Sequence, residues 1–242
     1  MVWSNKIPQQ VKINAKETLE KRLENTYHDF LSTMNPILGI NLVPKNKIEV
    51  KQIFIAAGYI SRDDPKKIVI GTDYWEEALG FDCDVCFDKW VTTKKIILGH
   101  EIGHIYHSKL NPEQFSKTTF EERRSLGNNW FLGEVIAELT MMTYFKVKSQ
   151  SDPNLEFSLA YTYDDGTNIG LISSMLVRDN TENLEPLLRY LHRADLSEAL
   201  KILDPYREKS KETIVVADQG LYFGFCGHKN SGNKLYRQLT LF

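Results

Sequence analysis

Hydrophobic positions recur at helical spacing in several long stretches of the chain. The first stretch covers residues 14–34, and its apolar face consists of Leu19, Leu23, Tyr27, Phe30, Leu31 and Met34. Asn14 is a suitable N-cap for this helix. Asn35-Pro36 is expected to end it, because the residue before a proline disfavours the helical conformation. The pattern therefore predicts a first helix with one buried face.

The chain after this helix has the composition of β-strands. Branched and aromatic apolar residues gather at 48–50, 53–55 and 68–70. The run 61–65 between the last two has turn-forming residues, which predicts a hairpin. A short helix is expected at 73–80.

Helical spacing returns in the rest of the chain. It predicts helices at 93–109, 128–147, 167–177, 186–193 and 197–203. Asn111-Pro112 is expected to close the first of these, and a polar stretch over 111–127 follows it. Asp195 is placed to cap the last helix. The tail from residue 213 alternates and contains glycines, which favours short strands and turns.

The order of these elements predicts an α+β fold with a small mixed or antiparallel sheet and a helical C-terminal part. The chain has 242 residues, a length that suits one catalytic domain of two lobes, which we place at 1–112 and 113–242. No apolar run is long enough to cross a membrane, and the N-terminal residues lack the pattern of a signal peptide. We therefore expect a cytoplasmic protein without a membrane partner.

The charge of the chain is nearly balanced, with 30 lysines and arginines against 32 aspartates and glutamates. No basic cluster is interleaved with aromatic residues, so nucleic acid is not an expected partner. No feature of the sequence specifies an oligomeric state.

The strongest chemical signal is His100-Glu101-Ile102-Gly103-His104 on the helix predicted at 93–109. Two histidines four residues apart lie about 40° apart around a helix axis and one turn apart along it. Their imidazoles can therefore bind one tetrahedral Zn²⁺ ion. From its position beside His100, Glu101 would reach the water on the ion rather than the ion. Gly103 leaves room for a metal or for an approaching backbone. A structural helix with incidental histidines is the alternative.

Zinc needs a third protein ligand, and Glu134 is the best candidate. It lies on the mostly apolar helix at 128–147, where an unpaired carboxylate is costly. Glu138 is one turn later on the same face and can accept the ring N–H of a ligand histidine. The reverse assignment stays open, as does a pair of glutamates that simply face solvent. His107 is one turn beyond the second histidine, so we expect it not to be a ligand.

The two segments resemble the gluzincin metallopeptidases, the group that includes thermolysin and many aminopeptidases. In that group H-E-x-x-H on one helix is followed by a metal-binding glutamate on a later helix, often as E-x-x-A. The matching residues here are 100–104 and Glu134 with Ala137, and the resemblance covers only about fifty residues. It implies a zincin-like fold and a peptide or protein substrate. It also implies that His100, His104 and Glu134 bind zinc and that Glu101 is the general base.

In such a mechanism Glu101 takes a proton from the attacking water and passes it to the leaving amine. A further donor is needed for the oxyanion. The candidates are Tyr144, Tyr161, Tyr163 and His192, and the sequence does not choose among them. The predicted hairpin would supply an edge strand that pairs with the substrate.

The cysteines allow a second, structural zinc site. Cys83 and Cys86, together with Cys226 and His228, have suitable ligand types. Buried or inert thiols are the alternative, because the acidic residues around the C-x-x-C pair disfavour a reactive thiolate.

Two other functions have to be weighed against a zinc peptidase. The same ion and base would serve a zinc hydrolase that acts on a non-peptide bond. A zincin-like binding or regulatory module without turnover is the other alternative. The presence of both histidines and the adjacent glutamate argues against this last possibility.

Overall fold

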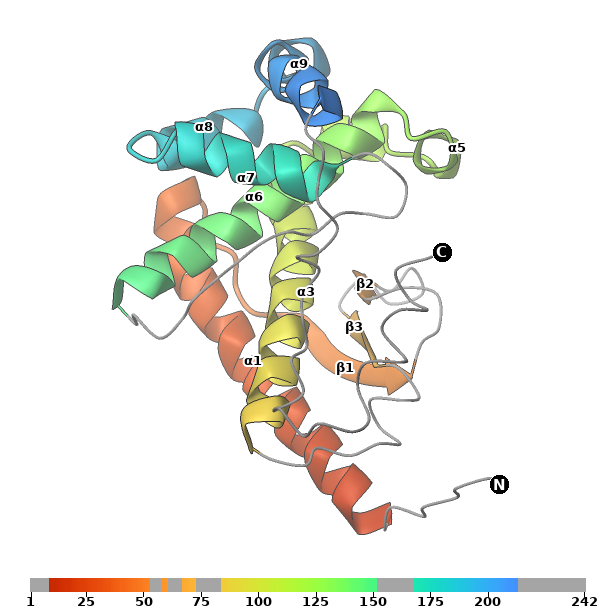
Figure 1. Ribbon diagram of the computed structural model, residues 1–242. Helices are drawn as coiled ribbons and strands as arrows, with labels where there is room; N and C mark the ends of the chain where they lie inside the picture. Colours follow the sequence, from red (N-terminus) through yellow and green to blue (C-terminus); the bar gives the residue numbers. More distant parts are fainter. Residues whose placement is uncertain (1–8, 53–57, 61–66, 73–83, 152–167, 213–242) are drawn as a thin grey trace. The chain divides into compact units, whose positions relative to one another are not determined.

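The computed structural model describes residues 9–52, 58–60, 67–72, 84–151 and 168–212 (Figure 1). These residues are mostly helical and include a small three-stranded sheet, which confirms the predicted α+β class. They fall into two compact units. Of the described residues, one unit contains those up to 25 and from 46 to 97, and the other contains 26–45 and those from 98 to 212. The lobes at 1–112 and 113–242 stay a prediction.

The sheet of the first unit is mixed. It consists of β1 (Lys47–Gln52), β2 (Gly58–Ile60) and β3 (Lys67–Thr72), in the order β1-β3-β2. β2 runs antiparallel to β3, as expected for a hairpin, and β1 runs parallel to β3. The residues 53–55, which were expected to form a strand, lie outside the described residues, as do the turn at 61–65 and the helix at 73–80.

Helix α1 (Gln9–Leu38) is longer than expected at both ends. It begins before Asn14, so that residue is not the N-cap, and it continues through Pro36 for two more residues. Its end is set by Gly39, which adopts the left-handed conformation with φ 65°. The side chain of Asn35 then bonds both the backbone N–H and the carbonyl of Leu42, at 3.0 Å each. Proline removes one backbone donor, and this loss is tolerated in a last turn that glycine already terminates.

The five other predicted helices are present among the described residues, and three of them are longer than expected. These three are α3 (Asp84–Leu110), α6 (Asn128–Ser151) and α9 (Leu196–Glu212), whereas α7 (Ile169–Asp179) and α8 (Leu184–Leu191) are each displaced by two residues. Two short helices, α4 (Pro112–Ser116) and α5 (Phe120–Arg124), lie between α3 and α6. Asp195 accepts a hydrogen bond from the backbone N–H of Glu198 at 2.9 Å, which confirms it as the cap of α9. The polar stretch at 111–127 holds two short helices that the apolar pattern did not predict. The tail from 213 lies outside the described residues.

The core of the second unit is built around α6, which contacts α4, α5, α7, α8 and α9. Figure 1 shows α6 in green, with α7 and α8 beside it. Its side chains from Trp130 to Phe145 are all buried. Because this helix is enclosed on several sides, any carboxylate on it has to find a partner inside the protein.

None of the described helices has a stretch that is both long enough and apolar enough to cross a membrane.

Candidate metal centre

Helices α3 and α6 are in close contact where Gly103 meets Ala137. A Cβ atom added to Gly103 would stand 2.6 Å from the Ala137 Cα and 2.7 Å from its carbonyl oxygen. One turn earlier, a Cβ atom added to Gly99 would stand 2.9 Å from a side-chain carbon of Met141 and 3.1 Å from the ring of Phe30. Both glycines thus leave space on the face of α3 that packs inside the second unit. The sequence suggested that Gly103 leaves room either for a metal or for an approaching backbone. The contact with Ala137 confirms the approaching backbone.

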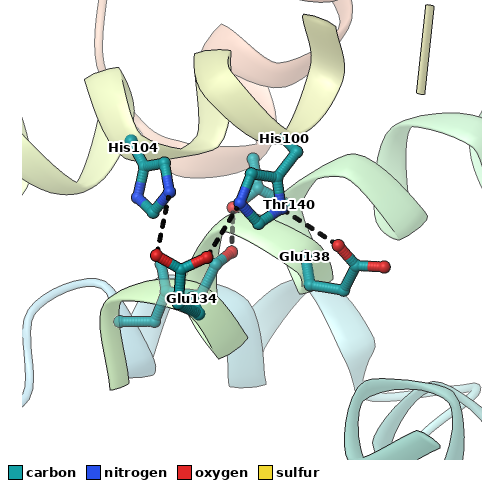
Figure 2. Close-up of polar contacts among 6 residues, drawn as sticks. His100, His104, Glu134, Glu138 and Thr140 are labelled. Carbon is teal, nitrogen blue, oxygen red and sulfur yellow. Dashed lines mark hydrogen bonds and ion pairs between the residues drawn. The ribbon is translucent and has the colours of Figure 1, made fainter. Parts of the chain in front are cut away.

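This approach brings the histidines of α3 over the glutamates of α6, as Figure 2 shows. His100 Nε2 lies 3.1 Å from one oxygen of Glu134, and His104 Nε2 lies 3.6 Å from the other oxygen. The nearest ligand atoms of the three residues all lie within 4.8 Å of one another. The two imidazole rings are nearly perpendicular, with centroids 4.8 Å apart. This buried group of two nitrogens and a carboxylate could hold a metal ion.

The other nitrogen of His100 contacts the second glutamate of α6. His100 Nδ1 lies 3.0 Å from Glu138 Oε2, and the Glu138 side chain is almost completely buried. The two glutamates thus contact opposite sides of one ring: Glu134 on the side shared with His104, and Glu138 on the far side (Figure 2). Of the two assignments that the sequence left open, this arrangement matches Glu134 as ligand and Glu138 as the residue that orients the ring.

The charges of the site follow from this geometry. Burial by itself lowers the pKa of His100, but the hydrogen bonds and charges of Glu134 and Glu138 outweigh burial and raise the pKa well above its ordinary value. This direction of the pKa shift favours the protonated ring, in which both nitrogens can donate to the carboxylates of Glu134 and Glu138. Two carboxylates hold one positive charge between them, and that charge lies where a cation would be bound.

The other two members of the cluster are in the forms that bind metal. Burial lowers the pKa of His104 to about 3, so its imidazole is neutral. Burial would raise the pKa of Glu134, but the neighbouring imidazoles of His104 and His100 together with Arg123 lower it to about 2. An ionised carboxylate and a neutral imidazole are the protonation states that zinc requires.

Glu101 differs from the glutamates of α6. It is nine-tenths buried, and burial raises its pKa to about 7, with a further upward contribution from Glu134. The charges of His100 and Arg123 act in the opposite direction. A carboxyl group with this pKa can both accept and return a proton near neutral pH.

Two of the four candidate oxyanion donors, His192 and Tyr144, have hydrogen-bond partners among the described residues. His192 is fully buried, and its Nε2 lies 2.9 Å from the hydroxyl of Thr140. The Tyr144 hydroxyl donates to Asp29 at 2.6 Å. Both groups thus already have hydrogen-bond partners other than the residues of the cluster. Tyr161 and Tyr163 lie outside the described residues.

The proposed structural zinc site lies mostly outside the described residues. Cys83, Cys226 and His228 lie outside the described residues. Cys86 belongs to α3, but its side chain is not among those described. The second zinc site therefore stays a prediction.

His107 is not part of the three-residue cluster, in line with the expectation from its helical position. It is 1% exposed, and neither ring nitrogen has a hydrogen-bond partner within the part of the chain that the structure describes. Its ring instead packs edge-on against Phe115 and His192, with centroids 5.7 Å and 6.0 Å away.

Two residues near the site were missed by the sequence analysis, namely Phe115 on α4 and Arg123 on α5. The ring of Phe115 lies 6.5 Å from that of His104. The positive charge of Arg123 lowers the pKa values of Glu101, His104 and Glu134. A local signal for α5 was present, because Thr119 and Glu122 have the spacing of a capping box. Thr119 does cap this helix by accepting from the N–H of Glu122 at 3.2 Å.

Comparison of the chain with protein-family models, with curated proteins and with solved structures finds no match. The assignment of this centre therefore depends on the chemistry and geometry of its own residues.

Proposed function

We propose that this protein is a zinc-dependent peptidase of zincin-like fold, with His100, His104 and Glu134 as the zinc ligands. The observation that carries the proposal is the convergence of two imidazoles from α3 and one carboxylate from α6 within 4.8 Å, in a buried position. Two nitrogens and one oxygen are a donor set found in catalytic zinc sites, which keep a fourth position open.

The charge distribution supports a cation rather than a purely structural ion pair. In the metal-free chain a proton on His100 Nε2 is held against Glu134. A zinc ion would replace this proton and would be attracted by the same carboxylate. When bound, zinc lowers the pKa of water toward about 7 and polarises a substrate carbonyl.

The two remaining glutamates have separate tasks in this proposal. Glu138 accepts the Nδ1–H of His100, which directs Nε2 toward the ligand position and increases the basicity of the ring. Glu101 takes a proton from the attacking water and returns it to the leaving amine. The pKa of about 7 that burial gives Glu101 suits both directions of transfer.

The test is hydrolysis of an unfolded protein such as reduced, alkylated casein by the purified chain, after loading with one equivalent of zinc. We expect cleavage that stops on addition of a chelator and returns with zinc. Hydrolysis of simple esters alone, with no peptide cleavage, would instead favour a zinc hydrolase of a non-peptide substrate. Stoichiometric zinc binding without any turnover would favour a binding or regulatory module.

A further inference from the structure

Two buried imidazoles outside the metal centre lie against each other in the core of the second unit. They belong to His107 of α3 and to His192 at the end of α8, and their ring centroids are 6.0 Å apart. Both ring nitrogens of His107 and the Nδ1 of His192 lack a hydrogen-bond partner among the described residues. Buried polar atoms are rarely left without a partner, so three such atoms at one contact indicate a place where a ligand binds.

Thr140 of α6 fixes which nitrogen of His192 carries the hydrogen. The Thr140 hydroxyl donates its single hydrogen to the carbonyl of Ile136 at 2.7 Å, so it can only accept from His192 Nε2, which lies 2.9 Å away. Burial lowers the pKa of His192 well below its ordinary value, so the ring is neutral and its Nδ1 is unprotonated. His192 Nδ1 is thus in the form that binds metal, and a hydrogen bond on the other side of the ring holds its orientation.

His107 provides a second nitrogen of the same kind. Burial lowers its pKa to about 4, so one of its two ring nitrogens is unprotonated at neutral pH. The ring of Phe115 packs edge-on against it, with centroids 5.7 Å apart. Within the described part of the chain, no carboxylate is hydrogen-bonded to either imidazole. Two neutral ligands in a buried position disfavour a divalent ion, whose charge would lack an anionic partner.

The separation of the two rings restricts the geometry of a bound ion. A direct N–H···N hydrogen bond of about 2.9 Å would bring the centroids to about 5 Å. Two metal–nitrogen bonds of about 2.0–2.1 Å separate the centroids by about 6 Å if the ion lies almost on the line between the nitrogens, and by about 1 Å less if the angle is tetrahedral. The observed 6.0 Å therefore fits a two-coordinate ion better than a tetrahedral one.

We propose that His107 and His192 form a second metal site, which binds one Cu⁺ ion between His192 Nδ1 and one ring nitrogen of His107. Cu⁺ accepts two ligands in a nearly linear arrangement, and imidazole is among the ligands that suit copper. Its single charge costs less to bury than the charge of a divalent ion. The site is separate from His100, His104 and Glu134, and it does not depend on their proposed function as a zinc centre.

Copper titration of the chain, with zinc added first to fill the other centre, tests this inference. The ion is supplied as Cu⁺ under anaerobic reducing conditions, in competition with a coloured Cu⁺ chelator. Because thiolates bind this ion tightly, the background is the variant Cys83→Ser/Cys86→Ser/Cys226→Ser, which has no cysteine. We expect one copper per chain, with an X-ray absorption spectrum that shows two imidazole ligands. If this background does not fold, the copper spectra of the native chain and of His107→Leu are compared, and the native chain should show more nitrogen ligands.

Variants of the two histidines and of their surroundings locate the copper. His107→Leu and His192→Leu each remove one of two ligands and should weaken copper binding by more than the 10–100-fold typical of an orienting residue. Thr140→Val removes the acceptor of His192 Nε2 and should weaken it by about 10–100-fold. His28→Gln, at an exposed histidine, is the matched control and should leave the affinity unchanged. If His192→Leu does not fold, His107→Leu and Thr140→Val carry the test.

His104→Ala separates the two metal sites. This variant removes a ligand of the proposed zinc centre and should bind copper with unchanged affinity. The inference is overturned if copper does not bind in stoichiometric amount, if His107→Leu retains the affinity of the wild type, or if copper is lost in His104→Ala. A crystal structure of the copper-treated chain that shows a water molecule between the rings, with no anomalous signal of copper, would overturn it as well.

Discussion

The backbone of Ala137 lies against the bare Cα of Gly103, so that a Cβ at residue 103 would stand 2.6 Å from the Ala137 Cα. The obstacle is backbone on a buried helix and not the end of a flexible side chain. The close contact of α3 and α6 therefore requires glycine at position 103. The convergence of His100, His104 and Glu134 depends on this contact.

Substitution of this glycine is expected to open the metal centre. Gly103→Ala should force the two helices apart, lower the free energy of unfolding by about 1–3 kcal/mol, as overpacking does, and weaken zinc binding. Urea unfolding and zinc titration measure the two effects. Gly133→Ala is the control, because its Cβ would meet no atom closer than 4.0 Å. That variant should keep its zinc and gain up to about 1 kcal/mol from helix propensity. Equal zinc affinity in both variants would contradict the role given to Gly103.

The two glutamates of α6 are predicted to respond differently to removal of their charge. Glu134→Gln removes a proposed ligand and should abolish stoichiometric zinc binding. Glu138→Gln keeps a hydrogen-bond acceptor near His100 Nδ1 and should retain zinc with affinity reduced about 10–100-fold, as for other residues that orient a ligand histidine. Competition with a coloured chelator measures both affinities. If Glu138→Gln lost zinc more completely than Glu134→Gln, Glu138 would be the ligand and Glu134 the residue that orients His100.

Glu101 is predicted to serve turnover and not metal binding. Glu101→Gln should retain one zinc per chain and lose peptide hydrolysis, because the amide cannot take up the proton of the attacking water. Elemental analysis and a peptide-cleavage assay on the same preparation separate the two properties. Substantial hydrolysis by this variant would remove Glu101 from the role of base.

The buried histidines His107 and His192 predict a loss of stability in weak acid. Burial lowers the pKa of His107 to about 4 and lowers that of His192 well below its ordinary value. Between pH 6.5 and about 4, the unfolded chain therefore binds protons that the folded chain does not. The contribution of His107 to stability is fully present above pH 6.5 and falls by about 1.4 kcal/mol per pH unit as the pH decreases below that value.

Replacement of His107 by leucine isolates its contribution to this effect. His107→Leu should be close to neutral at pH 7, because both ring nitrogens lack partners among the described residues. It should reduce the loss of stability between pH 6.5 and 4.5, as measured by urea unfolding of the zinc-free chain. His28→Gln, at an exposed histidine, is the comparison variant. An unchanged acid dependence in His107→Leu would show that His107 already takes up its proton in the folded state.

Predictions from the sequence succeeded where the chemistry depends on one helix. The spacing of His100, Glu101 and His104 is a property of helical geometry, so their shared face could be predicted without a fold. The choice between Glu134 and Glu138 as the ligand could not be predicted from the sequence, because both residues lie on one face of α6. Only the position of α6 against α3 shows which glutamate meets Nε2 and which meets Nδ1 of His100.

The errors in the predicted fold have equally local causes. Pro36 was expected to end α1, but the left-handed Gly39 ends it two residues after the proline. Helices α4 and α5 are too short for an apolar period, and they form because side chains such as Asn111 and Thr119 cap them. Arg123 was missed for the same reason. The parallel pairing of β1 with β3 could not be predicted, because alternation of residues does not encode strand direction.

The central claim is tested most directly by zinc titration of the purified wild-type chain, followed by X-ray absorption spectroscopy of the loaded protein. We predict one tightly bound zinc per chain whose spectrum shows two imidazoles and oxygen ligands at about 2.0–2.1 Å, and a loss of this site in His104→Ala. The claim would be contradicted if zinc did not bind in stoichiometric amount, or if the spectrum and the affinity were the same in His104→Ala as in wild type.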